Sequence, residues 1–120
     1  MMKIQDWSTA KQQNRKLVLT TCYDSWSARI LGETSIDAVL VGDSAAMVMH
    51  GEPSTLPIST QTMALHVAAV ARANKKTFII GDMPFLSYQI SKEEAVRNAG
   101  RFLKEAGAEA VKLEGGLEME

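Results

Sequence analysis

The chain has 120 residues, of which 46% are hydrophobic and 22% charged, a composition typical of one globular domain rather than a disordered segment. The formal net charge is −1 and there is no basic block, which argues against nucleic-acid binding. No apolar run approaches the roughly 20 residues of a membrane-spanning helix, and the start MMKIQDWSTAKQQ does not resemble a secretory signal, so we expect a cytoplasmic protein with no membrane partner.

The first half of the chain alternates helix-like and strand-like segments. Residues 4–13 are predicted as a short amphipathic helix, and residues 17–21 as a strand that ends at the polar tripeptide CYD. Residues 25–33 are predicted as a second helix. The apolar run at 38–43 has no polar alternation, which is typical of a strand whose two faces are both covered.

The second half repeats this alternation after a long connection. Residues 44–58 are too long for a routine turn, and we expect them to form a polar loop that could cover a site. A helix is predicted at 60–73 and a strand at 77–82. Another helix begins near residue 92, and its buried stripe is expected to comprise Ala95, Ala99, Phe102 and Ala106. The last strand is predicted at 110–114.

Two residues with reactive side chains are expected to be structural. His66 lies on the apolar stripe of helix 60–73, so a satisfied core or interface histidine is favoured over a ligand. The single cysteine, Cys22, cannot form an intrachain disulfide, and a small buried residue is favoured over a reactive thiol.

The alternation of helices and strands predicts an α/β protein with a parallel sheet. Sequence after the last strand offers no covering helix, although parallel strands are normally covered on both faces. Four β/α units are half of an eight-unit barrel. We therefore expect these residues to be a portion of a larger fold, or to be completed by a partner.

Three apolar runs each end in a carboxylate: Asp43, Asp82 and Glu114. The carboxyl ends of parallel strands meet at one edge, so these acids are expected to converge there, and converging oxygen ligands suit Mg²⁺. The alternative is that each acid lies in a turn and caps the next helix. For Asp43 and Asp82 the following helices begin too far along the chain for a simple cap.

Two further residues near the strand ends could act on a substrate. Lys112 and Glu114 share one face of their strand, so Lys112 either forms an internal ion pair with Glu114 or holds a substrate carboxylate and a developing negative charge. Ser44 is either a turn serine or a donor to a substrate oxygen. No nucleophile elbow, P-loop or dinucleotide fingerprint is present.

Four motifs occur in an informative order: VGDS at 41–44, GEPSTLPIS at 51–59, DMPF at 82–85 and VKLEGG at 111–116. Together they resemble the ketopantoate hydroxymethyltransferase family, also called 3-methyl-2-oxobutanoate hydroxymethyltransferase, from about residue 7 onward. The resemblance implies a (β/α)8 TIM barrel of the phosphoenolpyruvate mutase and isocitrate lyase type. Residues 1–120 would be its amino-terminal half, about four β/α units preceded by a short helix.

The resemblance also implies an activity. Family members transfer a one-carbon unit from 5,10-methylenetetrahydrofolate to 3-methyl-2-oxobutanoate through a Mg²⁺-stabilised enolate. The product is 2-dehydropantoate, an early compound of pantothenate and coenzyme A biosynthesis. The resemblance further implies a homo-oligomer, usually a decamer.

Carried over by motif, Asp43 and Asp82 are the expected Mg²⁺ ligands, and Glu114 a third, directly or through water. Asp43, Ser44, Asp82 and Lys112 are expected to contact the 2-oxo acid. The glutamate general base of the family comes from a later strand, so no catalytic base is expected in this chain, which should be inactive alone. Two departures are small: Ala45-Ala46 replaces the common Leu-Gly, and Gly81 replaces a common Ala.

Three alternatives remain open at this point. The first is another Mg²⁺-dependent lyase or mutase acting on 2-oxo acids. The second is a phospho-accepting receiver domain, disfavoured because its site needs an acid pair at the end of the first strand, where only Asp24 is available. The third is a purely structural or assembly role.

Overall fold

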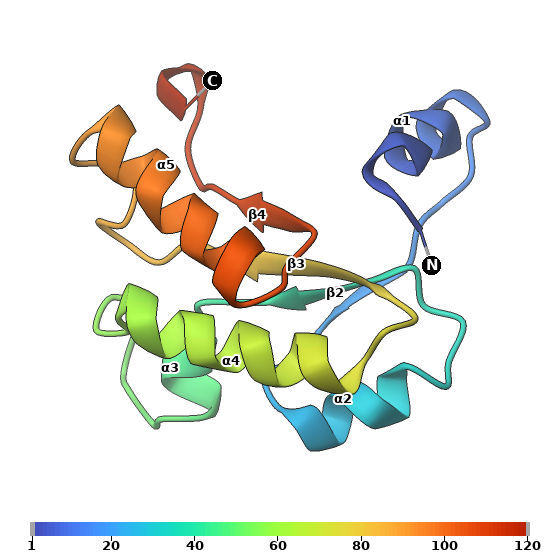
Figure 1. Ribbon diagram of the computed structural model, residues 1–120, viewed down its shortest axis with the longest axis horizontal. Helices are drawn as coiled ribbons and strands as arrows, with labels where there is room; N and C mark the ends of the chain where they lie inside the picture. The colour runs from blue at the N-terminus through green and yellow to red at the C-terminus, as the bar shows by residue number, and fades with distance from the viewer. Residues whose placement is uncertain (1, 120) are drawn as a thin grey trace.

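The computed structural model describes residues 2–119, which form a four-stranded parallel sheet with helices packed mainly on one face (Figure 1). The strands are β1 (Leu19–Thr21), β2 (Ala38–Val41), β3 (Phe78–Asp82) and β4 (Ala110–Lys112). The α-helices are α1 (Ile4–Gln12), α2 (Ser25–Leu31), α3 (Ala45–Val48), α4 (Thr60–Ala73) and α5 (Lys92–Gly100). A π-helix, η1 (Arg101–Glu105), continues α5, and a 3₁₀ turn, η2 (Leu117–Met119), follows β4.

The sheet order follows the sequence, β1-β2-β3-β4, and every neighbouring pair is parallel. In doubly wound sheets, including those of receiver domains, the first strand lies inside the sheet, and the order in which later strands are added reverses there. A sequential order is instead what successive β/α units of a barrel produce. The predicted α/β architecture with a parallel sheet is therefore confirmed, and the order argues against a receiver domain.

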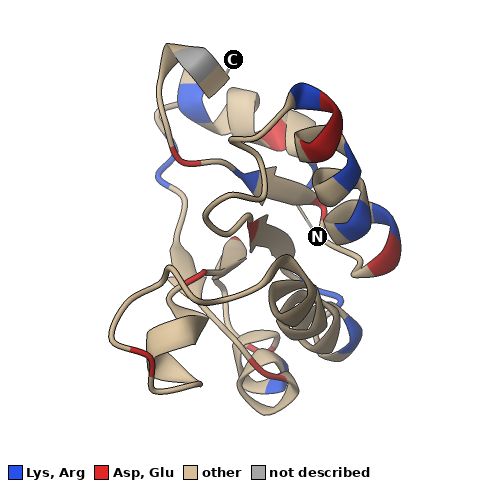
Figure 2. Cartoon of the chain, turned by 90° about the vertical axis from the view of Figure 1, so that its left-hand side faces the viewer, with Lys and Arg blue, Asp and Glu red and all other residues tan. Residues whose placement is uncertain are grey.

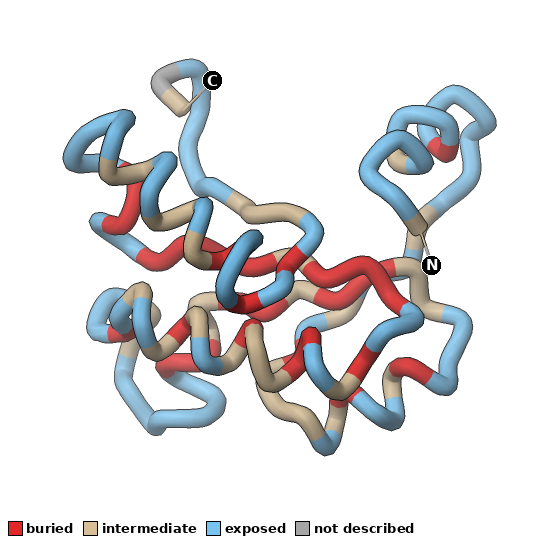
Figure 3. The backbone as a smooth tube through the Cα atoms, viewed as in Figure 1, coloured by how far each residue is buried: buried red, intermediate tan, exposed pale blue. Residues whose placement is uncertain are grey.

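The core lies between the sheet and α2, α4 and η1 (Figure 3). Alternate strand residues point toward these helices, as the two-residue period of a strand requires. On the helix side, α4 contributes an apolar stripe at the spacing predicted from the sequence. The fully buried members of this core include Val39, Val41, Ile79, Met63, Val67, Val70 and Phe102.

The opposite face of the sheet carries apolar side chains with much less cover. Phe78 packs edge-on against Trp7 of α1, with ring centroids 5.4 Å apart. Leu19 is 43% exposed, and Leu40 and Ile80 are partly exposed. In a closed barrel this face is the interior, filled by side chains from all strands.

The predicted element boundaries agree closely, although the strands are one or two residues shorter than expected. Two elements were not predicted. The first is the short helix α3, which lies in the 44–58 connection. Ala45 N donates to Gly42 O and Val48 N to Ser44 O, so the chain coils directly after β2. The second is η1, where a wider turn occurs at Phe102, the residue that packs on Gly81.

The buried stripe of the last long helix is confirmed only in part. Phe102 and Ala106 are buried, whereas Ala95 and Ala99 remain partly exposed because α5, apart from its continuation η1, has few contacts with other helices or strands. Within residues 2–119, no helix is both long and apolar enough to cross a membrane.

Helix α4 starts at Ser59, whose Oγ accepts a hydrogen bond from Thr62 N at 3.1 Å. Loss of this cap leaves a backbone N–H at the helix start without its partner. We expect Ser59→Ala to lower the free energy of unfolding by about 1 kcal/mol in urea titrations. Ser8→Ala, at an exposed α1 position, is the control. An equal change in the two variants would contradict the capping role.

Candidate functional site

The predicted site residues lie at the carboxyl-terminal edge of the sheet. Asp82 and Lys112 are the last residues of β3 and β4, and Asp43 and Ser44 follow β2. Figure 2 views the molecule from this side, where acidic and basic positions lie at neighbouring strand ends. The parallel arrangement thus places residues from three separate segments at one edge, as the sequence predicts.

Asp82 is the centre of this group. It is 3% exposed, and its two carboxylate oxygens have different partners. Oδ1 accepts a hydrogen bond from Lys112 Nζ at 2.8 Å, and Oδ2 accepts one from Asp43 N at 3.0 Å. The buried carboxylate therefore ties β4 and the turn after β2 to the end of β3.

Lys112 forms its ion pair with Asp82, not with Glu114 as one alternative expected. Burial alone would lower the pKa of its ammonium group. The hydrogen bond and charge of Asp82, together with the charges of Glu114 and Asp43, outweigh that effect and raise the pKa of Lys112. Lys112 is therefore a permanent positive charge at this edge.

Asp43 is partly buried beside a second carboxylate. Burial, followed by the negative charge of Asp82, raises the pKa of Asp43, although Lys112 and a hydrogen bond from the Thr55 side chain act in the opposite direction. Two close carboxylates share one neutralising ammonium group here. Such a site has residual negative potential and attracts a cation.

The Ser44 side chain lies near the Asp82 carboxylate, and Gly42 lies between the two. Its Oγ lies 2.8 Å from the hydroxyl oxygen of Tyr23, which follows β1. A Cβ on Gly42 would lie 3.0 Å from Ser44 Oγ and 3.8 Å from Asp82 Oδ2. The absence of a side chain at Gly42 therefore leaves room between a hydroxyl and a carboxylate.

Glu114 lies two residues beyond β4 and is exposed. Tyr88 holds its backbone, because the Tyr88 hydroxyl donates to Glu114 O at 3.0 Å and accepts from Glu114 N at 3.1 Å. Glu114 and Asp43 line one pocket with Thr55. Across residues 2–119, however, no three His, Cys, Asp or Glu side chains are grouped closely enough to bind a metal directly.

The residues present fit Mg²⁺. This ion is bound by oxygen atoms, retains several waters and commonly uses only one or two protein carboxylates. Asp43 and Asp82 supply such a pair, and the space left by Gly42 lies beside Asp82. Glu114, across the pocket, is suited to contact through water.

Three residues that lie beside the predicted site residues were not themselves predicted from the sequence: Tyr23, Thr55 and Tyr88. The polar tripeptide that contains Tyr23 marks a strand end, and Thr55 belongs to the predicted polar loop. Those signals indicate proximity to the site without identifying a partner. Tyr88 contacts the backbone of Glu114, and no sequence pattern marks that contact.

The structure confirms that the His66 ring is hydrogen-bonded and that Cys22 is buried. His66 is hydrogen-bonded through both ring nitrogens, to Tyr23 O and to His50. Cys22 is buried, and that burial raises the pKa of its thiol, which opposes formation of a reactive thiolate.

The raised pKa of Asp43 gives a stability prediction for the metal-free chain. Ionised Asp43 destabilises the fold at neutral pH, and this penalty disappears as pH falls below the ordinary pKa of 3.8, where the folded and unfolded states are both protonated. We expect Asp43→Asn to raise the melting temperature at pH 7 in EDTA. The difference from the parent chain should shrink to zero below pH 3.8. A constant or growing difference on acidification would contradict the predicted shift.

The family model for ketopantoate hydroxymethyltransferase matches residues 1–120. A 3-methyl-2-oxobutanoate hydroxymethyltransferase of Staphylothermus marinus is 58% identical over 105 residues, covering 88% of this chain and 38% of that protein. The enzyme of the same name from Ignicoccus hospitalis is 52% identical over 116 residues, covering 97% and 44%. The chain thus spans less than half the length of these relatives.

Solved structures with a similar fold are more distant in sequence. A phosphonopyruvate hydrolase, in complex with oxalate and Mg²⁺, superposes with a TM-score of 0.72 at 15% identity, covering 92% of this chain and 38% of the other. A 2,3-dimethylmalate lyase of the PEP mutase/isocitrate lyase superfamily gives 0.69 at 17% identity, covering 95% and 40%. These matches agree with the predicted β/α-barrel fold, and they bear on the fold alone.

Proposed function

The chain belongs to the ketopantoate hydroxymethyltransferase family, and on this premise we propose that residues 1–120 form the amino-terminal half of a (β/α)8 barrel enzyme. The proposed reaction transfers a hydroxymethyl group from 5,10-methylenetetrahydrofolate to 3-methyl-2-oxobutanoate, giving 2-dehydropantoate. The observation that carries the proposal is the set Asp43, Asp82 and Lys112 at the carboxyl-terminal edge of the sheet. Active sites of β/α barrels are built at that edge.

Asp43 and Asp82 are the proposed Mg²⁺ ligands, with Glu114 in contact through water. When bound, Mg²⁺ acts as a Lewis acid toward the keto and carboxylate oxygens of the oxo acid, which makes the C3 proton easier to remove.

Lys112 and Ser44 are proposed to bind the oxo acid. The Lys112 ammonium stays charged because its pKa is raised, so it can stabilise negative charge that develops on the substrate oxygens. Ser44 is held by the Tyr23 hydroxyl and can donate a hydrogen bond to a substrate oxygen, in which case Tyr23 donates to Ser44. Asp82 keeps Lys112 in position through the 2.8 Å hydrogen bond.

The base that accepts the C3 proton is proposed to come from sequence that follows residue 120 in full-length relatives. A cytoplasmic location, expected from the sequence, and a decameric homo-oligomer, implied by the family resemblance, remain proposals. A 2-oxo acid lyase or mutase is less well supported, because relatives at 50–58% identity carry the hydroxymethyltransferase name and the lyase match has 17% identity.

The test joins residues 1–120 to the carboxyl-terminal remainder of the Staphylothermus marinus relative. We expect this folded protein to form 2-dehydropantoate from the oxo acid and 5,10-methylenetetrahydrofolate, only when Mg²⁺ is present, whereas the 120-residue chain has no activity. The intact relative, assayed in parallel, is the positive control. A folded chimera that is inactive while the relative is active would contradict the assignment.

A further inference from the structure

The second feature with potential chemistry is a pair of histidines outside the proposed active site. His50 follows α3, and His66 lies in the middle of α4. Their Nε2 atoms are 2.8 Å apart, and the ring centroids are 5.1 Å apart with an interplanar angle of 80°. Two imidazole nitrogens from separate segments therefore face the same point.

The hydrogen bonds of the pair define which nitrogens carry protons. His66 Nδ1 lies 2.7 Å from Tyr23 O, and a carbonyl oxygen only accepts, so Nδ1 of His66 carries hydrogen. In the neutral ring, Nε2 of His66 then presents its lone pair. The hydrogen between the two rings consequently belongs to His50 Nε2.

This arrangement is typical of a metal-binding histidine. Ligating histidines usually donate their second ring N–H to a carbonyl or carboxylate, which fixes the tautomer and the ring orientation. His66 already has that partner in Tyr23 O. His50 is exposed, so an ion can approach from solvent and the ring can adjust to it.

We propose that His50 and His66 chelate a divalent transition-metal ion, with Zn²⁺ as the reference ion and water in the remaining positions. Imidazole nitrogen suits Zn²⁺, Ni²⁺ and Cu²⁺, in contrast to the oxygen ligands of the Asp43–Asp82 pair. On binding, the His50 proton moves from Nε2 to Nδ1, so that both Nε2 lone pairs point at the ion.

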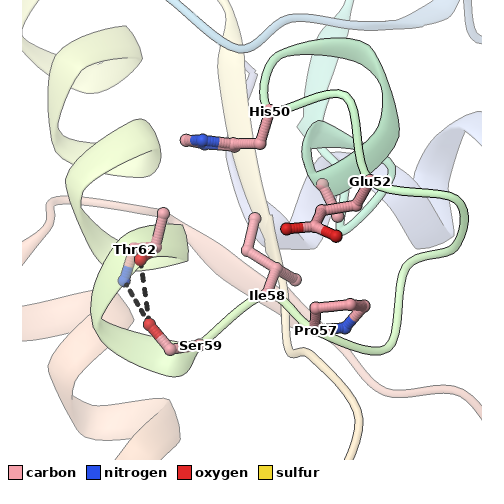
Figure 4. Close-up of a pocket in the computed structure, with 7 residues that line it drawn as sticks. His50, Glu52, Pro57, Ile58, Ser59 and Thr62 are labelled. Carbon is pink, nitrogen blue, oxygen red and sulfur yellow. Dashed lines mark hydrogen bonds between the residues drawn. The ribbon is translucent and has the colours of Figure 1, made fainter.

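A pocket of about 170 Å³ lies beside His50 and is also lined by Glu52, Ile58 and Thr62 (Figure 4). His66 is not among its lining residues, and the His50 ring projects toward α4, away from Glu52. Glu52 projects from the same loop, but it is not grouped with the histidines closely enough to complete a three-residue metal cluster. The two histidines are therefore the protein ligands of this site.

The position of the site suggests its effect. His50 immediately precedes the segment 51–59, and His66 lies in the helix that follows it. Thr55, within that segment, lines one pocket together with Asp43 and Glu114. An ion held by the two histidines would fasten the loop to α4 and so limit the movement of Thr55.

The test is a Zn²⁺ titration of the chain followed by ¹H NMR. The chain has 2 histidines, so the imidazole Hε1 signals report on this pair alone. We expect both signals to shift together and saturate at one ion per chain. His50→Ala should weaken Zn²⁺ binding at least tenfold, because removal of a group that only hydrogen-bonds a metal ligand already lowers metal affinity by about tenfold or more. His50 is exposed, so this substitution leaves the core intact, which the melting temperature checks.

Two control variants separate this site from its neighbours. Glu52→Gln should leave the Zn²⁺ affinity within about twofold, and Asp82→Asn should leave it equally unchanged, since neither supplies a ligand. Excess Mg²⁺ should not displace the ion. Absence of the Hε1 shifts, or binding unaffected by His50→Ala, would overturn the proposal. Displacement of Zn²⁺ by Mg²⁺, or a loss of Zn²⁺ affinity in Asp82→Asn, would instead assign the ion to the carboxylates. These results do not depend on whether the enzyme activity is confirmed.

Discussion

Asp82→Asn in the chimeric full-length protein should lower Mg²⁺-dependent kcat/KM by roughly 100- to 1,000-fold, the range for loss of one electrostatic group in an active site. Asparagine keeps the shape of the side chain and can still accept the hydrogen bond from Asp43 N. It removes the charge that pairs with Lys112 and that is proposed to bind the metal. The measurement is the initial rate of 2-dehydropantoate formation over a series of Mg²⁺ concentrations.

The control for this variant is Glu93→Gln, which removes one negative charge from the exposed start of α5. It should retain near-normal kcat/KM, because Glu93 is exposed and its charge is screened by solvent. Glu93→Gln should unfold at a temperature close to that of the parent, and the rates are compared at a temperature at which Asp82→Asn is folded. Near-normal activity of Asp82→Asn would refute the ligand role, since the carboxylate would then be dispensable.

The sheet and the position of its functional edge could be predicted because they follow from local patterns. Unbroken apolar runs at 38–43 and 77–82 indicate covered strands, and the predicted helix 60–73 matches α4 residue for residue. The short helix α3 was missed because its residues, AAMV, follow a strand directly and are too few to show a helical period. The π-turn in η1 was missed because it reflects packing of Phe102 on the sheet, a tertiary effect.

The carboxylates of the site were predictable for the same reason: each follows an apolar run. Their individual partners were not. Lys112 shares a strand face with Glu114, which suggested that pair, but the register of β3 with β4 places Lys112 beside Asp82. Register depends on the whole sheet, so no spacing within β4 could reveal it. Likewise, the contact of Thr55 with Asp43 depends on the path of a long loop.

The packing around Gly81 explains why glycine stands at this position, where the family resemblance led us to expect alanine. A Cβ at this position would lie 2.5 Å from Cδ1 of Phe102 and 3.3 Å from Cγ2 of Val67. Phe102 and Val67 are both fully buried in a close-packed core, so moving either side chain costs free energy. We expect Gly81→Ala to lower the free energy of unfolding by about 1–3 kcal/mol in urea titrations, as overpacked cores do. Gly100→Ala should instead raise the free energy of unfolding by about 1 kcal/mol, because the added Cβ would have no atom within 4 Å apart from its chain neighbours and the helix's own backbone.

A double-mutant cycle tests whether Phe102 is the cause. Phe102→Ala alone should cost about 3–5 kcal/mol, because it opens a cavity in the core. In the Gly81→Ala, Phe102→Ala double variant the clash is gone and the new methyl group enters that cavity. The double variant should therefore be no less stable than Phe102→Ala alone, a coupling of at least about 1 kcal/mol. Strict additivity would mean that Gly81 is required by the strand backbone or by Val67, and not by the ring of Phe102.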